Sequence, residues 1–371
     1  MNLLYIVAKA EYFLSHRLAL AKEAKAAGYS IAVATTKFCE KDVCQLAGFE
    51  IFPARFKRGG INPFAELKTI FDLVKIFKKS QPSLVHNVAL KPALYGSMIA
   101  RFYKKPTVNA INGFGYIFTS HHLKARFLRP FIKFIFRCIL NHPSVYVIIQ
   151  NQQDYLECEA LLPRCNLFLV LGSGVDTKIF RPVSYQGVFT FTLVARMLWS
   201  KGVGEFVEAA QHFIKNNPEK KVRFLLVGAD DPENPESIPL GALKKWHDEG
   251  SIEWLGHNNN IQDVYSQTHV AVLPSYREGL PKSLLEAMAC GLPIITTDAI
   301  GCRDIVDDTN GIKVPVKNAE ALALAFEKCA ADPQMCEAMG KQGRIKAENM
   351  YAIDIINQQI INIYRKIPDN S

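Results

Sequence analysis

Two pairs of charged residues in the second half of the chain have the types and spacing to hold a phosphorylated ligand. Arg196 and Lys201 follow an apolar run, and a helix is expected to open directly after Lys201. A guanidinium and an ammonium beside a helix N-terminus can neutralise a diphosphate. Glu278 and Glu286 stand in a loop and in the helix that follows it. Because carboxylates accept hydrogen bonds from hydroxyl groups, the two pairs together suit a ligand that is part polyol and part phosphate.

The segment between the two glutamates contributes backbone groups. A helix is expected to begin near Pro281, so the free amides from Gly279 through Leu280 to Ser283 would point at an anion. The alternatives are structural: Arg196 and Lys201 could occupy a solvated loop, and Glu286 could be a favourable charge for the helix dipole.

Several motifs that would indicate other chemistry are absent from the sequence. Neither the dinucleotide-binding nor the P-loop glycine pattern occurs, and there is no D-x-D motif. A metal-bridged diphosphate site is therefore disfavoured, and no metal or other cofactor is expected. Nine cysteines without a C-x-x-C pair argue against a zinc site or a disulfide framework and favour a reducing cytoplasm.

The elements that must position these residues alternate between short apolar runs and helix-period stretches. Strands are predicted at Leu3–Ala8, Ser30–Thr35, Ser83–His86, Thr107–Ile111, Val145–Gln150, Leu167–Val170, Phe189–Ala195, Val222–Val227, Ser251–Trp254, Val270–Leu273 and Pro293–Thr297. Helices are predicted at Ser15–Ala27, Pro63–Lys79 and Ala125–Leu140. This alternation predicts an α/β fold of two doubly wound, Rossmann-like domains. Such sheets bind ligands at the carboxyl ends of their strands.

The length of 371 residues fits two domains at ~150 residues each. We place one Rossmann-like domain at 1–182, a second at 188–350, and a terminal helix at 351–371 that packs back on the first domain. The segment Phe180–Gly187, which contains Pro182, is predicted to be the linker between the two domains.

Charge is divided unevenly along the chain. Residues 1–150 hold 22 basic and 7 acidic residues, a net charge of +15, whereas the remainder holds 22 and 28, a net charge of −6. The basic half indicates an anionic partner, such as nucleic acid, a membrane surface or a phosphorylated substrate, unless the excess has no function.

Together, Arg196-x4-Lys201, Glu278-x7-Glu286 and the segment Gly172–Asp176 resemble retaining glycosyltransferase family 4, whose GT-B fold has two domains facing a central cleft. The resemblance covers nearly the whole chain. It implies a hexosyltransferase whose N-terminal domain at 1–182 binds the acceptor and whose domain at 188–350 binds the nucleotide sugar. Arg196 and Lys201 would bind the donor diphosphate. Glu286 would hold the ribose, Glu278 would contact the transferred sugar, and the turn at Gly256 and His257 would lie by the base.

Two segments, 196–203 and 273–279, are most similar to one branch of this family. That branch adds N-acetylgalactosamine in an α1,3 linkage to undecaprenyl-diphosphate-linked N,N'-diacetylbacillosamine, and it includes O-antigen (lipopolysaccharide) enzymes. The resemblance implies a UDP-sugar donor, a lipid-linked saccharide acceptor and no metal. It also implies that a donor phosphate oxygen accepts the acceptor's proton; the sequence itself shows no obvious pair of base and nucleophile.

The first half departs from many family members. The glycine-rich loop after the first strand is replaced by Lys9–Ser15, and His16 is expected to begin the next helix. A histidine found elsewhere in the family is replaced by Asn112, next to Gly113. His16, His86, Asn112 and Gly113 are therefore candidates for contact with the acceptor or the donor sugar. For the histidines, a structural role is the alternative.

The stretch from His121 to Leu140 combines Arg126, Arg129, Lys133 and Arg137 on one helical face with phenylalanines on much of the rest. It suits the surface of an anionic membrane, and equally a core helix with a basic edge. No apolar run is long enough to span a bilayer. The expected location is the cytoplasm, peripheral on the inner face of the cytoplasmic membrane.

Three other functions compete with this interpretation. The same fold could act on a soluble or polysaccharide acceptor, or it could be a nucleotide-sugar epimerase, which Glu278-x7-Glu286 fits less well. A basic nucleic-acid-binding protein is the third alternative. No binding module is recognisable, however, and the basic residues are scattered, so nucleic acid is not expected as a partner.

Overall fold

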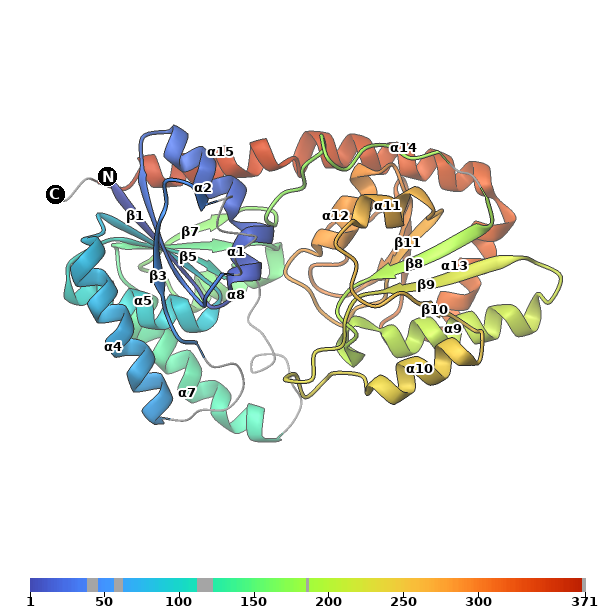
Figure 1. Ribbon diagram of the computed structural model, residues 1–371, viewed down its shortest axis with the longest axis horizontal. Coiled ribbons are helices and arrows are strands. Elements are labelled where there is room, and N and C mark those ends of the chain that lie inside the picture. Colours follow the sequence, from blue (N-terminus) through green and yellow to red (C-terminus); the bar gives the residue numbers. More distant parts are fainter. Residues whose placement is uncertain (39–45, 57–62, 112–122, 185–186, 369–371) are drawn as a thin grey trace. The chain divides into compact units, whose positions relative to one another are not determined.

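The computed structural model describes residues 1–38, 46–56, 63–111, 123–184 and 187–368. The chain divides into two compact units, the first comprising Met1–Ser173 with Ile356–Ser371 and the second Gly174–Ile355. Each unit contains a parallel sheet with helices packed against it (Figure 1). The predicted α/β class, with two doubly wound sheets, is confirmed.

In the described residues, the first unit forms a seven-stranded parallel sheet in the order β3-β2-β1-β4-β5-β6-β7. Its strands are β1 (Asn2–Val7), β2 (Ser30–Thr35), β3 (Glu50–Pro53), β4 (Leu84–Val88), β5 (Thr107–Ile111), β6 (Val145–Ile149) and β7 (Asn166–Leu169). Alternate residues of β1 enter two different cores, with Leu3 and Tyr5 in one and Leu4 and Ile6 in the other. Both faces are buried from Leu3 to Val7, which explains why this part of the strand carries no charged residue.

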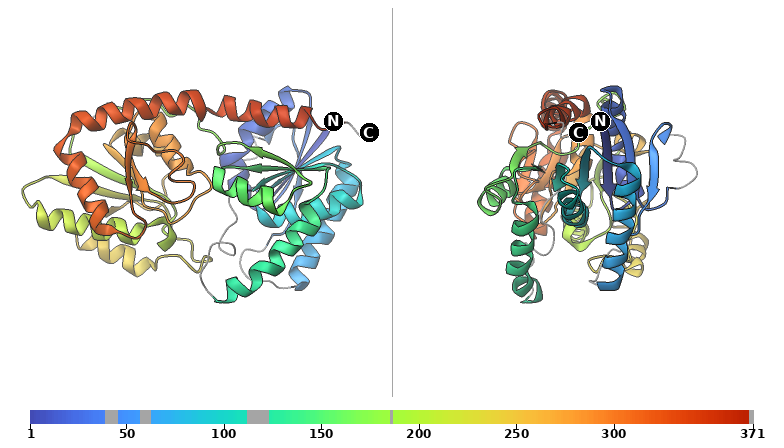
Figure 2. Two further views of the ribbon diagram at one scale, coloured as in Figure 1. Left: turned by 180° about the vertical axis from the view of Figure 1, so that it is seen from behind. Right: turned by 90° about the vertical axis from the view of Figure 1, so that its left-hand side faces the viewer.

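The helices of the first unit supply the other half of each core. They are α1 (Ala10–His16), α2 (Leu18–Ala26), α4 (Pro63–Ser80), α5 (Leu90–Phe102), α7 (Leu123–Leu140), α8 (Gln152–Leu161) and α15 (Ile353–Arg365). Phe13 of α1, Leu20 of α2 and Ile360 of α15 join one core, whereas α4 and α5 join the other. The N-terminal ends of α4 and α7 extend past the sheet in the same direction (Figure 2).

The described residues of the second unit form a six-stranded parallel sheet in the order β10-β9-β8-β11-β12-β13. Its strands are β8 (Phe189–Val194), β9 (Val222–Val227), β10 (Glu253–Trp254), β11 (Val270–Leu273), β12 (Ile294–Thr297) and β13 (Gly311–Val314). The helices are the 3₁₀ turn η2 (Trp199–Lys201), α9 (Val203–Asn216), α10 (Leu240–Asp248), α11 (Ile261–Ser266), α12 (Lys282–Ala289), α13 (Ala319–Ala331) and α14 (Pro333–Met350). The fully buried rings of Phe191, Phe206, Phe224 and Phe326 pack together in the core between the sheet, α9 and α13.

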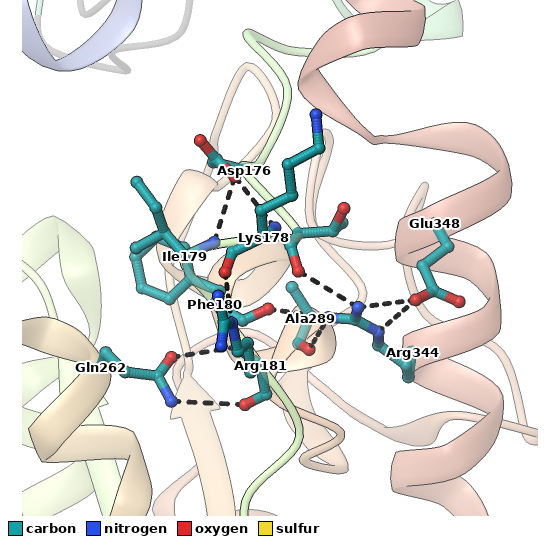
Figure 3. Close-up of polar contacts among 10 residues, drawn as sticks. Asp176, Lys178, Ile179, Phe180, Arg181, Gln262, Ala289, Arg344 and Glu348 are labelled. Carbon is teal, nitrogen blue, oxygen red and sulfur yellow. Dashed lines mark hydrogen bonds and ion pairs between the residues drawn. The ribbon is translucent and has the colours of Figure 1, made fainter.

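The segment that enters the second unit is fixed to it by Arg344 of α14 (Figure 3). The guanidinium donates to the carbonyl oxygens of Phe180 at 2.7 Å and Thr177 at 3.2 Å, and also to that of Ala289. Farther along, Val183 donates its backbone N–H to Cys290 at 3.0 Å. The change of unit therefore falls at Ser173–Gly174, ahead of the predicted linker Phe180–Gly187.

Three local features differ from the sequence prediction. Strands β3 and β13 were not predicted; each has only four residues and lies at an edge of its sheet. The expected helix Ser15–Ala27 is two helices, because the backbone leaves the helical conformation at Arg17. His16 therefore ends α1 instead of beginning a helix. None of the described helices is long and apolar enough to cross a bilayer.

Candidate functional site

The strand order of the second unit indicates which two loops border its ligand-binding crevice. From β8 the chain proceeds outward to β9 and β10, and it then returns to add β11 on the other side of β8. A doubly wound sheet opens a crevice where its strand order reverses, at the carboxyl ends of the two strands concerned. Here those strands are β8 and β11. The loop after β8 carries Arg196 and Lys201, and the loop after β11 carries Glu278.

These two loops are in direct contact. Gly202, with φ at +72°, lies so close to the β11 loop that a Cβ there would be 2.1 Å from the carbonyl oxygen of Pro274. Only glycine fits this approach and this backbone conformation. Tyr276 donates its backbone N–H to the carbonyl of Ser200 at 2.9 Å. The two loops therefore form one surface.

Lys201 and Glu278 form an ion pair on this surface, through Nζ and Oε1. Ser275 donates its hydroxyl to the same carboxylate oxygen at 2.7 Å. The Lys201 and Glu278 side chains are 21% and 12% exposed, so the pair is shielded but reachable from solvent. The sequence placed both residues in the site, and the structure brings them together.

Arg196 has a different partner. Its Nη1 lies 2.6 Å from Oδ2 of Asp231, which follows strand β9, and its side chain is 47% exposed. Ser200, in the same loop, donates its hydroxyl to Glu236 at 2.6 Å. The two cations of this loop are therefore each held by a separate carboxylate, Asp231 for Arg196 and Glu278 for Lys201.

Glu286 occupies the second turn of α12, where its carboxylate faces Lys282 at 3.3 Å. Burial raises the pKa of Glu286 above its ordinary value, and the neighbouring Lys282 partly opposes that rise. A shielded carboxylate at this position can accept hydrogen bonds from ligand hydroxyl groups.

The residues between the two glutamates lead into α12. Gly279 follows Glu278, Leu280 is buried, and Pro281 caps the helix. The carbonyl of Ser283 accepts a hydrogen bond of 2.6 Å from Tyr265. Because the first amides of a helix have no acceptor within it, the start of α12 offers donors to an anion.

The turn with Gly256 and His257 follows β10, beside the end of β9. Gly256 has φ at +64°, and its carbonyl accepts the backbone N–H of Gly228 at 2.7 Å. The indole of Trp254 donates to the carbonyl of Gly228 at 2.9 Å. His257 contacts Asn259 through its ring nitrogen at 3.0 Å. The turn is thus well ordered by backbone contacts around Gly228.

In the first unit, His86 does not lie where the sequence predicted it. His86 lies two residues inside β4 and is fully buried. Its Nδ1 lies 2.5 Å from the hydroxyl of Tyr364, which in turn lies 3.2 Å from the hydroxyl of Tyr5. The side chain of His86 is therefore inaccessible to a sugar or an acceptor. The sequence had predicted that it would lie in the crevice. Burial holds its pKa well below the ordinary histidine value.

His16 is more accessible than His86 and lies at the end of α1. Its ring stacks on Tyr12 with centroids 4.0 Å apart, and Nδ1 lies 2.7 Å from the hydroxyl of Ser15. Asn112 and Gly113 lie outside the described residues. Among the described residues, no cluster of three or more histidine, cysteine, aspartate or glutamate side chains could hold a metal ion.

Sequence reasoning did not predict the contacts of several residues that hold the site together. Asp231 and Ser275 lie in segments 228–231 and 275–281, which follow predicted strands and were candidates for ligand binding, but their contacts with Arg196 and Glu278 were not predicted. Lys282, the partner of Glu286, was not singled out, although its position four residues earlier on the same helical face is the spacing of an ion pair.

Comparison with known proteins connects this arrangement to glycosyl transfer. Residues 188–332 match the family described as "Glycosyl transferases group 1", and residues 2–151 match "Glycosyl transferase 4-like". The chain is 27% identical over 87% of both chains to the N,N'-diacetylbacillosaminyl-diphospho-undecaprenol alpha-1,3-N-acetylgalactosaminyltransferase of Campylobacter jejuni.

This chain is also similar to a second glycosyltransferase in sequence and to a solved structure in fold. The chain is 25% identical to the UDP-Gal:alpha-D-GlcNAc-diphosphoundecaprenol alpha-1,3-galactosyltransferase of Escherichia coli, over 79% of this chain and 78% of that one. Its structure matches sucrose-phosphate synthase from Thermosynechococcus elongatus with a TM-score of 0.81, over 99% of both chains at 20% identity. This last similarity establishes the fold.

Proposed function

We propose that this chain, which belongs to the family 4 glycosyltransferases and has their GT-B fold, transfers an N-acetylhexosamine from a UDP-sugar to an undecaprenyl-diphosphate-linked saccharide. The sugar is N-acetylgalactosamine or a close relative, its anomeric configuration is retained, and no metal takes part. The reaction belongs to the assembly of a bacterial O-antigen or protein glycan. The names of the two relatives support the donor and acceptor classes.

The observation that carries this proposal is the pairing of Lys201 with Glu278 at the point where the strand order reverses. In the structure, the Glu278 carboxylate is the partner of the Lys201 ammonium. A donor diphosphate can replace it as the partner of Lys201, and Glu278 is then free to accept hydrogen bonds from the transferred sugar. Arg196 contacts Asp231 through Nη1, so its other N–H groups can bind the diphosphate while Asp231 orients the guanidinium.

During transfer, the bond between the anomeric carbon and the diphosphate oxygen breaks while the acceptor oxygen bonds to the same face of that carbon. The acceptor's proton passes to an oxygen of the leaving diphosphate, so the products are UDP and the lengthened lipid-linked saccharide. Negative charge grows on the diphosphate, where Lys201, Arg196 and the α12 amides stabilise it. Glu286 holds the ribose hydroxyl groups.

The first unit supplies the side of the enzyme that meets the lipid-linked acceptor and the anionic membrane surface. Helix α7 exposes Phe131 and Phe134, at 61% and 64%, together with Lys133 and Arg137 of the same helix. Helix α4 exposes Phe71 at 64% and carries several lysines. Exposed aromatic rings among basic side chains favour binding to anionic lipid headgroups.

A donor screen tests the transfer reaction. The protein is incubated with UDP- and GDP-sugars, an undecaprenyl-diphosphate-linked saccharide and EDTA, and the anomeric configuration of the product is determined by NMR. We expect transfer from a UDP-N-acetylhexosamine with retention. Hydrolysis without transfer would overturn the acceptor assignment, and transfer to soluble saccharides alone would favour the polysaccharide alternative. Activity that requires a divalent cation would overturn metal independence.

Flotation with liposomes tests the membrane surface separately. We expect the protein to float with anionic vesicles at low salt and the double variant Phe131→Ser/Phe134→Ser to remain in solution. Ile214→Ser, which removes an exposed apolar side chain from the second unit, is the matched control and should float normally. Equal flotation of all three proteins would remove the assignment to α7.

A further inference from the structure

A hollow of about 580 Å³ opens on the second unit along helices α9 and α10, which lie side by side in Figures 1 and 2. We propose that this hollow is a second saccharide-binding site, distinct from the ion pairs of Lys201 and Arg196, which takes a neutral sugar unit of a glycan. It is lined by Trp199 of η2, Trp246 of α10 and a stripe of polar side chains on α9, namely Glu205, Glu208, Gln211 and His212.

The two indoles give the hollow an apolar wall. Their ring centroids are 6.1 Å apart and their planes are nearly perpendicular, and Trp199 is 42% exposed. The Trp199 ring rests on Gly204, because a Cβ at that glycine would lie 2.9 Å from Cζ3 of the indole. Contact with the backbone of α9 therefore holds the ring in place. A rigid, partly exposed aromatic face is a surface on which the C–H face of a sugar can stack.

The polar side chains supply both kinds of hydrogen-bonding group. Glu205 accepts a hydrogen bond from the hydroxyl of Tyr276 at Oε1 and its Oε2 is buried, so the carboxylate that a ligand can reach is that of Glu208, which is 62% exposed. Glu208 lies 3.8 Å from the ring nitrogen of His212, four residues later on α9. Gln211 adds an amide that both donates and accepts.

This mixture of groups distinguishes a saccharide from other ligands. The lining contains neither lysine nor arginine, so a phosphate or another anion would meet carboxylates without a fixed positive charge. A cationic amine would use the carboxylates and the indoles but leave the donor groups of Gln211 and His212 without a role. Sugar hydroxyl and acetamido groups use donors and acceptors together, and the ring uses the indoles.

The hollow adjoins both donor loops. Trp199 belongs to the loop after β8, next to Ser200 and Lys201. Tyr276, which donates to Glu205, lies in the β11 loop between Ser275 and Glu278. A sugar bound against α9 would therefore lie beside the loops that hold the ion pair of Lys201. The site needs neither the donor nor the acceptor of the proposed reaction, so it can be tested without an activity assay.

Fluorine NMR can detect binding at this site directly. The chain has three tryptophans, so protein labelled with 5-fluorotryptophan should give three resonances, which Trp199→Phe, Trp246→Phe and Trp254→Phe assign. The labelled protein is titrated with N-acetylglucosamine, N-acetylgalactosamine and N,N',N''-triacetylchitotriose. We expect the Trp199 and Trp246 resonances to shift and the Trp254 resonance to stay, with dissociation constants of about 1 mM, as for small ligands in open sites.

Two variants show whether the hollow itself is responsible. Gly204→Ala should weaken binding at least about tenfold, because the new methyl group displaces the Trp199 ring while alanine favours the helix. Gly241→Ala, on α10 with open space around it, is the matched control and should bind normally. The proposal is overturned if no saccharide shifts Trp199 or Trp246, or if only a cation such as spermidine does. A lack of transferase activity with saccharide shifts present would overturn the proposed function alone.

Discussion

Each unit has a doubly wound sheet, but the side chains at the point where the strand order reverses differ between the two units. In the second unit, the loops at this point carry ion pairs that solvent can reach, Lys201 with Glu278 and Arg196 with Asp231. In the first unit, the polar groups on β1 and β4 are sealed inside, where Tyr364 contacts both His86 and Tyr5. The same type of sheet therefore carries solvent-accessible ion pairs in the second unit and a buried, uncharged network of hydrogen-bonding side chains in the first.

Arg17 is the exception within the first unit. It is 2% exposed, and among the described residues its side chain has no acidic partner, only a hydrogen bond of 3.2 Å to the carbonyl of His16. Its positive charge lowers the pKa of His86 further, in the same direction as burial. The network of the first unit thus keeps its histidine uncharged, whereas in the second unit Lys201 and Arg196 are each paired with a carboxylate.

The largest expected effect comes from removing charged side chains of the second unit. Lys201→Ala and Glu286→Ala should each lower turnover at least ~100-fold, because they remove groups that hold the donor and its developing charge. Steady-state kinetics with the UDP-sugar measures this loss, and thermal unfolding checks that both variants fold. His86→Gln, the matched change in the first unit, should retain most turnover. Near-wild-type rates for Lys201→Ala would remove the site assignment.

The network of the first unit should affect stability instead of turnover. Tyr364→Phe removes the hydroxyl that contacts both His86 and Tyr5, so we expect a loss of about 1–3 kcal/mol in the free energy of unfolding. Urea denaturation measures this change. Tyr103→Phe, in the same unit but outside the network, is the control. A large fall in turnover with unchanged stability would show that Tyr364 serves catalysis and would break the contrast between the units.

The pair of Arg196 and Asp231 should have an intermediate effect on activity. Asp231→Asn keeps the shape of the side chain but removes the charge that orients the guanidinium, so we expect about a tenfold loss of kcat/KM. Asp230→Asn is the neighbouring control and should change kcat/KM little. An equal loss in both variants would mean that the acidic character of the loop matters, and not the pair itself.

The smallest expected effect is a dependence of stability on pH. His86 stays neutral in the folded protein below pH ~6.5, where an unfolded histidine takes up a proton. The unfolded state then binds more protons, so stability falls as the pH drops, by up to about 1.4 kcal/mol per pH unit for this group. Urea denaturation between pH 7 and 5 should show a shallower fall for His86→Gln. Parallel curves for both proteins would show that His86 does not cause the dependence.

The donor half of the site could be predicted because its residues follow strand ends, which apolar runs reveal. Lys201 and Glu278 were assigned in this way and are in contact. The same reasoning misplaced His86, because β4 continues to Val88 and not only to His86. An error of two residues at a strand end is enough to move a side chain from a crevice into a core. A helix at 351–371 was predicted to pack on the first domain, but the contact of its Tyr364 with His86, 278 positions earlier, could not be predicted because it depends on the exact register of that helix.

Helix α15 has a consequence for the order in which the protein folds during synthesis. The buried side chains of Ile356, Ile360 and Tyr364 belong to the main core of the first unit, yet the ribosome makes them after the entire second unit. Domains generally fold as units during translation, beginning with the N-terminal one. Here the N-terminal unit lacks part of its core until α15 emerges, so the second unit is the first that can be complete. The synthesis of α15, and not the arrival of residue 173, then sets the moment at which the core of the first unit can close.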